Sequence, residues 1–354
     1  MKKISIIIPC HNCSEWVLHN WKSLKEQSIG IDDLECIYVD DASNDDGKTW
    51  DSLNRIKNEK TESVVIVRLK ENRRQGGARN VGLQHVTGKY ILFLDADDMY
   101  RPETCKELYD LAEEEKADII QFDCETTSRS MDDISIPDRE KNDEYYTINF
   151  ENNEEIRKTY LSGYIEPFSV LNKLYLSELV TKVNSHFAEH KVYEEPLFVY
   201  PLFFYVKKMQ YTSAKYLIWR RHENSTMAVD LGPKINDHIA VQLELLEDIK
   251  KREALYIKYK KEVDFHFFYS YYLETLIFSR WNRGAFLSLD VFRRLQDTVR
   301  KECNNIYLNR YYIAMKGKRL FDKAVRSVYS CFDSQEILDA FLDELFHIWT
   351  IDGV

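Results

Sequence analysis

Short apolar runs and stretches of helical periodicity alternate along the first 125 residues. Apolar runs rich in β-branched residues predict strands over residues 4–8, 34–39, 63–69, 90–94 and 117–124. Apolar residues at helical spacing predict helices between them, over residues 15–27, 48–58, 76–86 and 102–115. This alternation predicts a Rossmann-like α/β fold, in which a mostly parallel sheet carries helices on both faces. Ligands of such sheets bind beyond the carboxyl ends of the strands.

The pattern changes in the rest of the chain. Residues 128–153 are polar and acidic and predict a loop or an insertion, whereas the aromatic-rich residues 160–179 and 192–205 predict further folded structure. After Leu231 the strand signals end, and amphipathic helices are predicted over residues 235–257, 263–281, 287–299 and 335–349. We therefore expect three parts, over residues 1–125, 126–230 and 231–354, the last an all-helical module. Its aromatic run Phe265–Tyr272 is expected in a core or at a subunit interface, with a sugar-binding platform as the alternative.

Composition narrows the class of protein. Of the 354 residues, 44% are hydrophobic and 31% are charged, which is typical of a soluble globular protein. The net charge of −10 argues against broad binding to nucleic acid, which needs a clustered basic surface. No signal sequence opens the chain, and no stretch approaches the roughly 18 apolar residues of a membrane span. The seven cysteines are scattered, which indicates reduced thiols and a cytoplasmic location.

Cys10 and Cys13 have the spacing of a redox or zinc motif directly after a strand. The sequence offers no second cysteine or histidine pair that would complete a tetrahedral zinc site. We expect both to be incidental core residues, with a redox role as the alternative.

The segment Asp95-Ala96-Asp97-Asp98 closes the fourth predicted strand. Carboxylates are the hard oxygen ligands that Mn²⁺ and Mg²⁺ prefer, and a diphosphate needs such a cation to offset its charge. Three carboxylates within four residues repel one another unless solvent or a metal relieves them. The alternative is a turn in which Asp98 caps the helix that begins near Pro102.

Two further segments lie at the same predicted edge of the sheet. Asp40 and Asp41 close the second strand, where a carboxylate can accept the imide N–H of a base; turn chemistry is the alternative. Three arginines surround a glycine pair after the third strand, where Arg79 can fork onto phosphate oxygens; a basic turn is the alternative. The spacing is not Gly-x-Gly-x-x-Gly, which argues against a dinucleotide-binding dehydrogenase.

Four segments together carry a family resemblance, in the family's order. They are a strand ending Pro-x-His-Asn, then Val-Asp-Asp-x-Ser, Gly-x-Ala-Arg-Asn-x-Gly, and a strand leading to Asp-x-Asp, at residues 5–12, 38–43, 76–82 and 88–98. The chain therefore resembles the GT-A-fold, family 2 inverting glycosyltransferases that build bacterial cell-surface polysaccharides and cell-wall polymers. Weaker likeness continues at residues 171–175, 193–198 and 220–225. It implies a nucleotide-sugar half (1–125) and an acceptor half (126–230) of one GT-A domain.

The resemblance implies a role for each matching residue. The implied metal ligands, for Mn²⁺ or Mg²⁺, are Asp97, Asp95 and His222. The implied donor-binding residues are Pro9, His11, Glu15, Asp40, Asp41, Asn72, Arg79, Asp95, Ala96 and Arg221. Glu195 stands where the family has an aspartate that acts as the base, with Glu194 as the alternative. A pair of acids that merely opens a helix is the other interpretation.

These observations predict an enzyme that transfers a sugar from a nucleotide-diphosphate donor, expected to be UDP-linked, to a saccharide or glycopolymer hydroxyl with inversion. A nucleotidyltransferase and a catalytically silent sugar-nucleotide-binding scaffold are the alternatives. Homo-oligomerisation through the C-terminal helices and peripheral association with the inner face of the membrane stay open.

Overall fold

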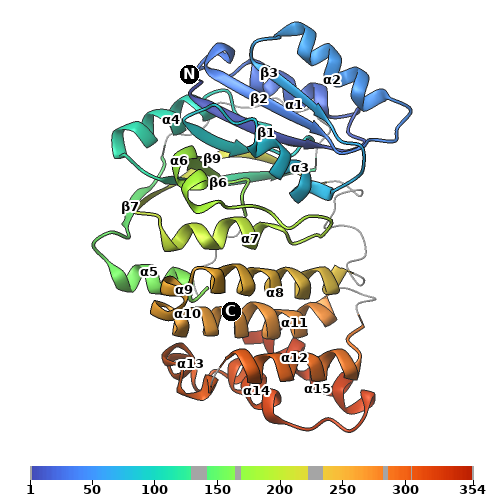
Figure 1. The fold of residues 1–354 in the computed structure, drawn as a ribbon, viewed down its shortest axis with the longest axis vertical. Coiled ribbons are helices and arrows are strands. Elements are labelled where there is room, and N and C mark those ends of the chain that lie inside the picture. Colours follow the sequence, from blue (N-terminus) through green and yellow to red (C-terminus); the bar gives the residue numbers. More distant parts are fainter. Residues whose placement is uncertain are drawn as a thin grey trace. The chain divides into compact units, whose positions relative to one another are not determined.

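The computed structural model describes residues 2–128, 142–163, 169–221, 234–281, 286–303 and 305–352. The chain divides into two compact units. The sheet unit comprises Met1–Glu154 and Phe168–Ser225, and the helical unit comprises Glu155–Pro167 and Thr226–Val354. Figure 1 traces the chain from blue at its N-terminus to red at its C-terminus.

The sheet unit is built on a nine-stranded sheet. Its strands are β1 (Ile4–Cys10), β2 (Leu34–Asp40), β3 (Val64–Arg68), β4 (Tyr90–Phe93), β5 (Met99–Tyr100), β6 (Ile119–Thr127), β7 (Tyr145–Asn149), β8 (Lys173–Leu176) and β9 (Lys208–Arg220). The order is β3-β2-β1-β4-β8-β6-β9-β5, with β7 also paired to β9. The strands β3, β2, β1 and β4 are parallel, as the alternation predicted. β8 runs antiparallel to both β4 and β6, whereas β6 and β9 are parallel.

The predicted strands and helices of the first 125 residues are all present, with ends that move by a few residues. The helices of the unit are α1 (Val17–Lys25), α2 (Lys48–Glu59), α3 (Arg74–Leu83), α4 (Thr104–Glu115), α6 (Ser177–Val183) and α7 (Glu195–Val199). β7 lies within the predicted loop of residues 128–153, which is a correction. Three of its five residues are exposed tyrosine or threonine, so it lacks the buried face that marks a strand in sequence.

Strand β1 shows that the sheet is buried on both faces. Ile6 and Ile8 belong to the core cluster that includes Leu53 of α2. Ile7 faces the other side, where a Cβ on Gly82 of α3 would lie 2.5 Å from its Cγ2 atom. Helices therefore cover both faces, which explains why β1 is a continuous apolar run.

In the helical unit, as far as the structure describes it, helices replace strands after residue 233. They are α5 (Glu154–Leu161), α8 (Ile235–Lys251), α9 (Glu253–Lys258), α10 (Lys260–Phe267), α11 (Glu274–Trp281), α12 (Leu289–Glu302), α13 (Arg310–Met315), α14 (Arg319–Tyr329) and α15 (Gln335–Asp352). A π-helical turn over Phe268–Leu273 joins α10 to α11. The aromatic run Phe265–Tyr272 is mostly buried there, as a core prediction requires.

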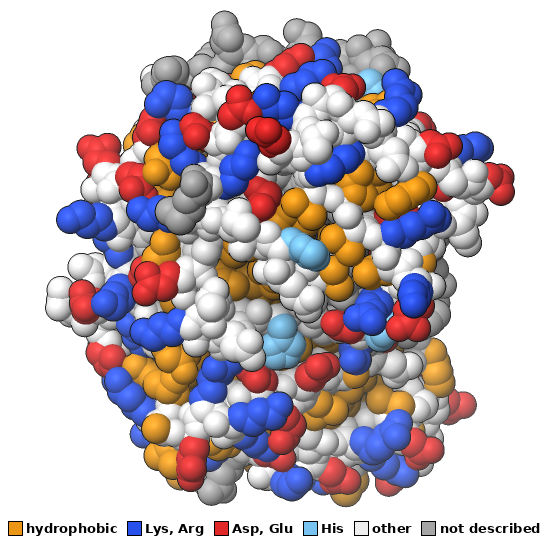
Figure 2. Space-filling view, turned by 45° about the horizontal axis from the view of Figure 1, so that its top comes forward, with side chains coloured by type: hydrophobic (Ala, Val, Ile, Leu, Met, Phe, Trp, Pro, Cys, Tyr) orange, Lys and Arg blue, Asp and Glu red, His pale blue; other side chains and the backbone are white. Residues whose placement is uncertain are grey.

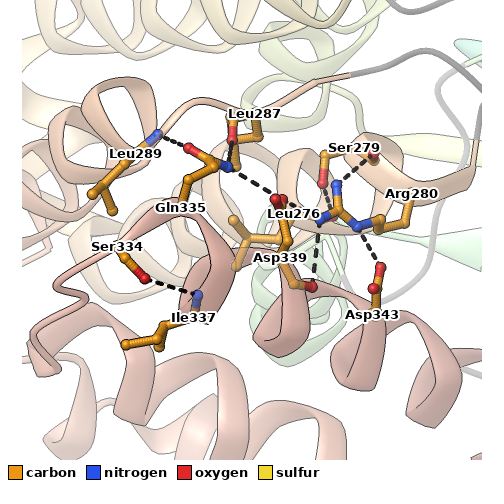
Figure 3. Close-up of polar contacts among 10 residues, drawn as sticks. All are labelled: Leu276, Ser279, Arg280, Leu287, Leu289, Ser334, Gln335, Ile337, Asp339 and Asp343. Atoms are coloured by element: carbon orange, nitrogen blue, oxygen red, sulfur yellow. Dashed lines mark hydrogen bonds and ion pairs between the residues drawn. The ribbon is translucent and has the colours of Figure 1, made fainter.

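Polar contacts fix the start of α15 against two other helices (Figure 3). Arg280 at the end of α11 donates to Asp339 at 2.6 Å and to Asp343 at 2.7 Å. Gln335 accepts the backbone N–H of Leu289, the first residue of α12, at 2.8 Å. Charged and amide contacts therefore help to hold α11, α12 and α15 together in this unit, in addition to apolar packing.

Candidate active site at the carboxyl ends of the strands

The Asp95–Asp98 segment follows β4 as a tight turn. The backbone N–H of Leu94 still pairs with Ile7, and the N–H of Asp98 then closes the turn on the carbonyl of Asp95 at 3.0 Å. One carboxylate oxygen from each of Asp95, Asp97 and Asp98 lies within 4.8 Å of the others. The three side chains thus form one oxygen cluster, in which Asp95 and Asp97 are partly exposed and Asp98 is buried.

Asp98 is held by the end of β9 rather than by a helix. Its Oδ1 accepts the backbone N–H of Arg220 at 2.8 Å, and α4 begins only at Thr104. The helix-capping alternative for Asp98 is therefore wrong. Its Oδ2 is buried without a hydrogen-bond partner among the described residues. Burial, together with the charges of Asp95 and Asp97, raises the pKa of Asp98 well above its ordinary value.

Arg79 of α3 links this cluster to a second pair of acids. Its Nη2 donates to Asp95 at 2.8 Å and its Nη1 donates to Glu194, while the guanidinium also lies 5.5 Å from the centre of the Phe187 ring. The residue is only 1% exposed. Burial lowers the pKa of Arg79, but the charges of Asp95 and Glu194 more than offset this and leave it raised. The guanidinium is thus engaged by protein carboxylates.

Glu194 and Glu195 stand at the start of α7, and their side chains have different partners. Glu194 is buried against Arg79. Glu195 accepts the backbone N–H of Val170 at 3.2 Å. Burial and the neighbouring charge of Glu194 raise the pKa of Glu195 to about 7, against the opposing charge of Arg79. Glu195 is therefore close to half-protonated near neutral pH, which suits a group that accepts a proton.

The loop before α7 is fixed to α3 by contacts that the sequence analysis did not single out. Asn80 donates to the carbonyl of Phe187 at 3.0 Å and accepts its N–H at 2.8 Å. Gly76 is required by close approach, because a Cβ there would lie 2.1 Å from the carbonyl oxygen of Ala188. The Gly-x-Ala-Arg-Asn segment thus places Glu194 and Glu195 as well as supplying Arg79.

The second acidic segment, at the end of β2, contacts mainly backbone. Asp40 accepts the N–H of Ser43 at 2.9 Å and pairs with Arg68 at 3.2 Å. Asp41 is 3% exposed, and its Oδ1 accepts the N–H of Arg73 at 2.7 Å. Burial raises the pKa of Asp41, while the N–H of Arg73 opposes the shift. His11 lies beside this segment, with its Nδ1 2.9 Å from the carbonyl oxygen of Asp41.

The remaining predicted donor-binding residues lie around this edge in different degrees of exposure. Asn72 and Glu15 are exposed, and the Asn72 amide lies 3.2 Å from Nδ1 of His11. Pro9 and Ala96 are buried at the ends of β1 and β4.

Two arginines at the end of β9 are placed differently. Arg221 is exposed and its guanidinium lies 5.1 Å from the Trp219 ring centre. His222, a predicted metal ligand, lies outside the described residues. The neighbouring Arg220 was missed: it is buried 4.4 Å from the Trp16 ring centre, and its Nε and Nη2 have no hydrogen-bond partner among the described residues. Its signal in the sequence was its place at the start of the 220–225 segment, which carries the weaker family likeness.

Cys10 and Cys13 are buried free thiols at 1% and 4% exposure. Burial raises the pKa of the Cys10 thiol well above its ordinary value. A redox motif needs an accessible thiol with a lowered pKa, so the geometry favours two core residues.

Residues 5–180 match the family described as "Glycosyl transferase family 2". The chain therefore carries a glycosyl transferase family 2 domain in this N-terminal region. Among curated proteins it is 34% identical over 137 residues to the poly(ribitol-phosphate) beta-N-acetylglucosaminyltransferase TarP of Staphylococcus aureus, covering 37% of this chain and 40% of the relative. It is 36% identical over 117 residues to a poly(ribitol-phosphate) beta-glucosyltransferase of Bacillus spizizenii, covering 33% and 18%. The match thus spans less than half of either relative.

Solved structures extend the likeness of fold to both units. The S. aureus TarS 1-349 structure in complex with UDP-GlcNAc matches with a TM-score of 0.64 at 18% identity, over 98% of this chain and 91% of that one. A second structure of TarS 1-349 matches with a TM-score of 0.67. At this level of identity the likeness concerns the fold, and it supports the GT-A-like architecture followed by helices.

Proposed function

We propose that this chain transfers a sugar from a UDP-linked donor to a hydroxyl of a cell-wall or surface glycopolymer, with inversion at the anomeric carbon. The observation that carries the proposal is the chain of contacts from Asp95 through Arg79 to Glu194, next to Glu195. It joins the acidic turn after β4 to Glu194, and the pKa of about 7 of the adjacent Glu195 suits a base. The named relatives act on poly(ribitol-phosphate), which supports an acceptor of that class.

The oxygen cluster of Asp95, Asp97 and Asp98 fits a divalent cation such as Mn²⁺ or Mg²⁺. Its donor set is hard oxygen, and Oδ2 of Asp98 is buried without a protein donor among the described residues. Asp97, partly exposed, would hold the cation on the donor diphosphate, with Asp95 beside it. Bound there, the cation supplies Lewis-acid neutralisation of the charge that grows on the leaving diphosphate.

Residues of the chain carry out the other steps of the proposed reaction. Glu195 removes the proton of the acceptor hydroxyl as its oxygen attacks the anomeric carbon, and the bond to the diphosphate oxygen breaks with both electrons on the leaving UDP. Arg79 pairs with both Asp95 and Glu194 and so ties the start of α7 to the acidic turn after β4. This positions the carboxylate of the adjacent Glu195 relative to the donor. His11, Asn72, Asp41 and Glu15 frame the nucleoside at the end of β2.

The test is a panel of nucleotide-sugar donors, led by UDP-GlcNAc and UDP-glucose, scored by release of UDP with Mn²⁺ present. Turnover that increases when a ribitol-phosphate oligomer is added, and a product of inverted configuration by NMR, is the expected result. If no donor is hydrolysed or transferred by the folded protein, the function as proposed is wrong.

Binding to nucleic acid needs a clustered basic surface. On the face drawn in Figure 2, lysine and arginine side chains are interspersed with aspartate and glutamate. The described helices include none whose length and apolar content would let it cross a bilayer.

A further inference from the structure

A groove lies within the helical unit, between α14 and α15. Its volume is about 470 Å³, which is within the range of binding sites for small molecules and chain segments. It is lined by Gly317, Arg319, Asp322, Lys323, Arg326, Ser327, Ser330, Phe332, Phe341, Glu344 and Ile348. All of these belong to the helical unit, whereas the carboxylates at the strand ends belong to the sheet unit.

The α14 wall of the groove is basic. Arg319, Lys323 and Arg326 follow one another at spacings of four and three residues, which places them on one face of the helix. Seven residues of helix separate the first from the last by about 10 Å along the axis. The lining also contains the acids Asp322 and Glu344, so three cations against two acids leave the groove a net charge of +1.

The acids of the groove have partners inside the protein, whereas two of the cations do not. Glu344 pairs with Lys323, and Asp322 accepts the N–H of Gly317 at 3.1 Å. Arg319 and Arg326 are exposed and line the groove, and their guanidinium groups make no hydrogen bond or ion pair with another described residue. The charge of Arg319 nevertheless contributes to the lowered pKa of Glu344. Two guanidinium groups are therefore available to an anion in the groove.

Apolar residues line the groove beside Glu344: Phe341 and Ile348 of α15, and Phe332 before it. Phe341 of α15 lines the groove, with Nζ of Lys323 5.4 Å from its ring centre, and Phe332 lies 4.8 Å from the ring centre of the core residue Phe292. Aromatic rings offer apolar contact to the carbon backbone of a polyol or sugar. The groove thus combines anion-binding groups on one side with apolar surface on the other.

We propose that this groove binds the phosphodiester backbone of the acceptor glycopolymer, through residues other than those of the site of transfer. This proposal rests on the function proposed above and adds which residues bind the acceptor. Arginine forks onto phosphate oxygens, and two arginines about 10 Å apart are engaged together by a chain with repeated charges but singly by a free phosphate. A flat anionic membrane surface cannot enter a groove walled by two helices, so a polymer fits the geometry and a bilayer does not.

The experiment measures binding of a synthetic ribitol-phosphate oligomer to the full chain by calorimetry, at several salt concentrations. Arg319→Gln combined with Arg326→Gln is expected to weaken binding about tenfold at low salt. It should also lower the slope of log affinity against log salt by roughly 1.4, as for two lost phosphate contacts on a single strand. Inorganic phosphate should bind far more weakly than the oligomer, because it lacks the second contact.

Matched variants separate this groove from general surface charge. Arg319→Lys with Arg326→Lys keeps both charges and should bind within a few-fold of the parent. Lys251→Glu, at an exposed position at the end of α8, should leave binding unchanged. Equal weakening by Lys251→Glu, unchanged binding in the glutamine pair, or equal binding of a polyuronate of the same length would each overturn the proposal. So would binding to anionic vesicles that depends on the same two arginines.

Activity distinguishes this proposal from the function on which it rests. The glutamine pair should raise the KM for the oligomer while leaving hydrolysis of UDP-GlcNAc unchanged, because neither arginine belongs to the site at the strand ends. Donor hydrolysis by a parent protein that does not bind the oligomer would refute the groove and leave the function standing. Oligomer binding with no turnover of any donor would refute the function alone.

Discussion

The pair Asp40 and Asp41 closes β2, and the cluster of Asp95, Asp97 and Asp98 follows β4 at the same edge of the sheet, yet most of their partners differ. Asp40 and Asp41 accept backbone N–H groups of Ser43 and Arg73, so they shape the loops around them. Asp95 pairs with the side chain of Arg79, which in turn pairs with Glu194 from a distant part of the chain.

The difference teaches that an acidic pair after a strand is not by itself a functional signal. A carboxylate that accepts backbone N–H groups has a structural use whether or not a ligand is bound. Asp95, Asp97 and Asp98 instead lie within 4.8 Å of one another, and like charges at that distance need a counter-charge. Arg79 supplies part of it, and a divalent cation on a diphosphate would supply the rest.

The largest effect is expected at Asp97. Asp97→Ala should reduce both transfer and donor hydrolysis below detection, because the cation would lose its partly exposed ligand. Circular dichroism should show an intact fold, since Asp97 is not a core residue. EDTA should abolish the activity of the parent protein, and added Mn²⁺ should restore that activity. Full activity in EDTA, or in the variant, would show that the acidic cluster after β4 needs no cation for the reaction.

Glu195→Gln is expected to reduce kcat by about 10²–10⁴-fold, the usual cost of losing a general base. UDP affinity by calorimetry should stay nearly constant, because Glu195 does not contact the diphosphate in the proposed mechanism. Glu194→Gln is the comparison variant: it removes a charge from a buried pair with Arg79 and should lower the melting temperature. If Glu194→Gln instead lowers kcat by this factor and leaves the melting temperature unchanged, the base is Glu194.

Asp41→Ala tests whether Asp40 and Asp41, at the end of β2, have only a structural role. We expect UDP affinity to fall by roughly 1.5–3 kcal/mol, as for a lost hydrogen bond to a charged group. Stability should fall as well, because the N–H of Arg73 loses its acceptor. Calorimetry on the folded variant decides the matter: unchanged UDP affinity would assign Asp41 to the loop and remove it from the nucleoside site.

The smallest effect concerns pH. Since Glu195 must be ionised to accept a proton and its pKa is raised to about 7, kcat should rise with pH through 7 and fall about tenfold for each unit below it. The raised pKa also favours the protonated form in the fold, so its contribution to stability is complete at acid pH and is lost as pH rises through about 7. Glu195→Gln should remove both dependences, and a flat profile in the parent would contradict the assignment.

Much of the sheet unit was predictable because its signals are local. Buried strands such as β1 are continuous apolar runs, and helices such as α2 repeat every 3.6 residues, so each shows its period in the sequence. β9 was not assigned because lysine, glutamine and serine interrupt its apolar positions. Its place beside β6 comes from tertiary pairing, which also brings Arg220 to Asp98.

The sequence by itself determined the alternating α/β architecture, the helical end of the chain and the family, because these depend on periodicity and on motifs of adjacent residues. Only the tertiary structure decided which charges meet. Arg79 and Glu194 are 115 residues apart, and their contact depends on Asn80 and Gly76 seating the loop before α7. The burial that raises the pKa of Glu195 to about 7 is likewise a property of the packed fold. Coulomb interactions and desolvation depend on distance and surroundings in space, and neither is written in residue order.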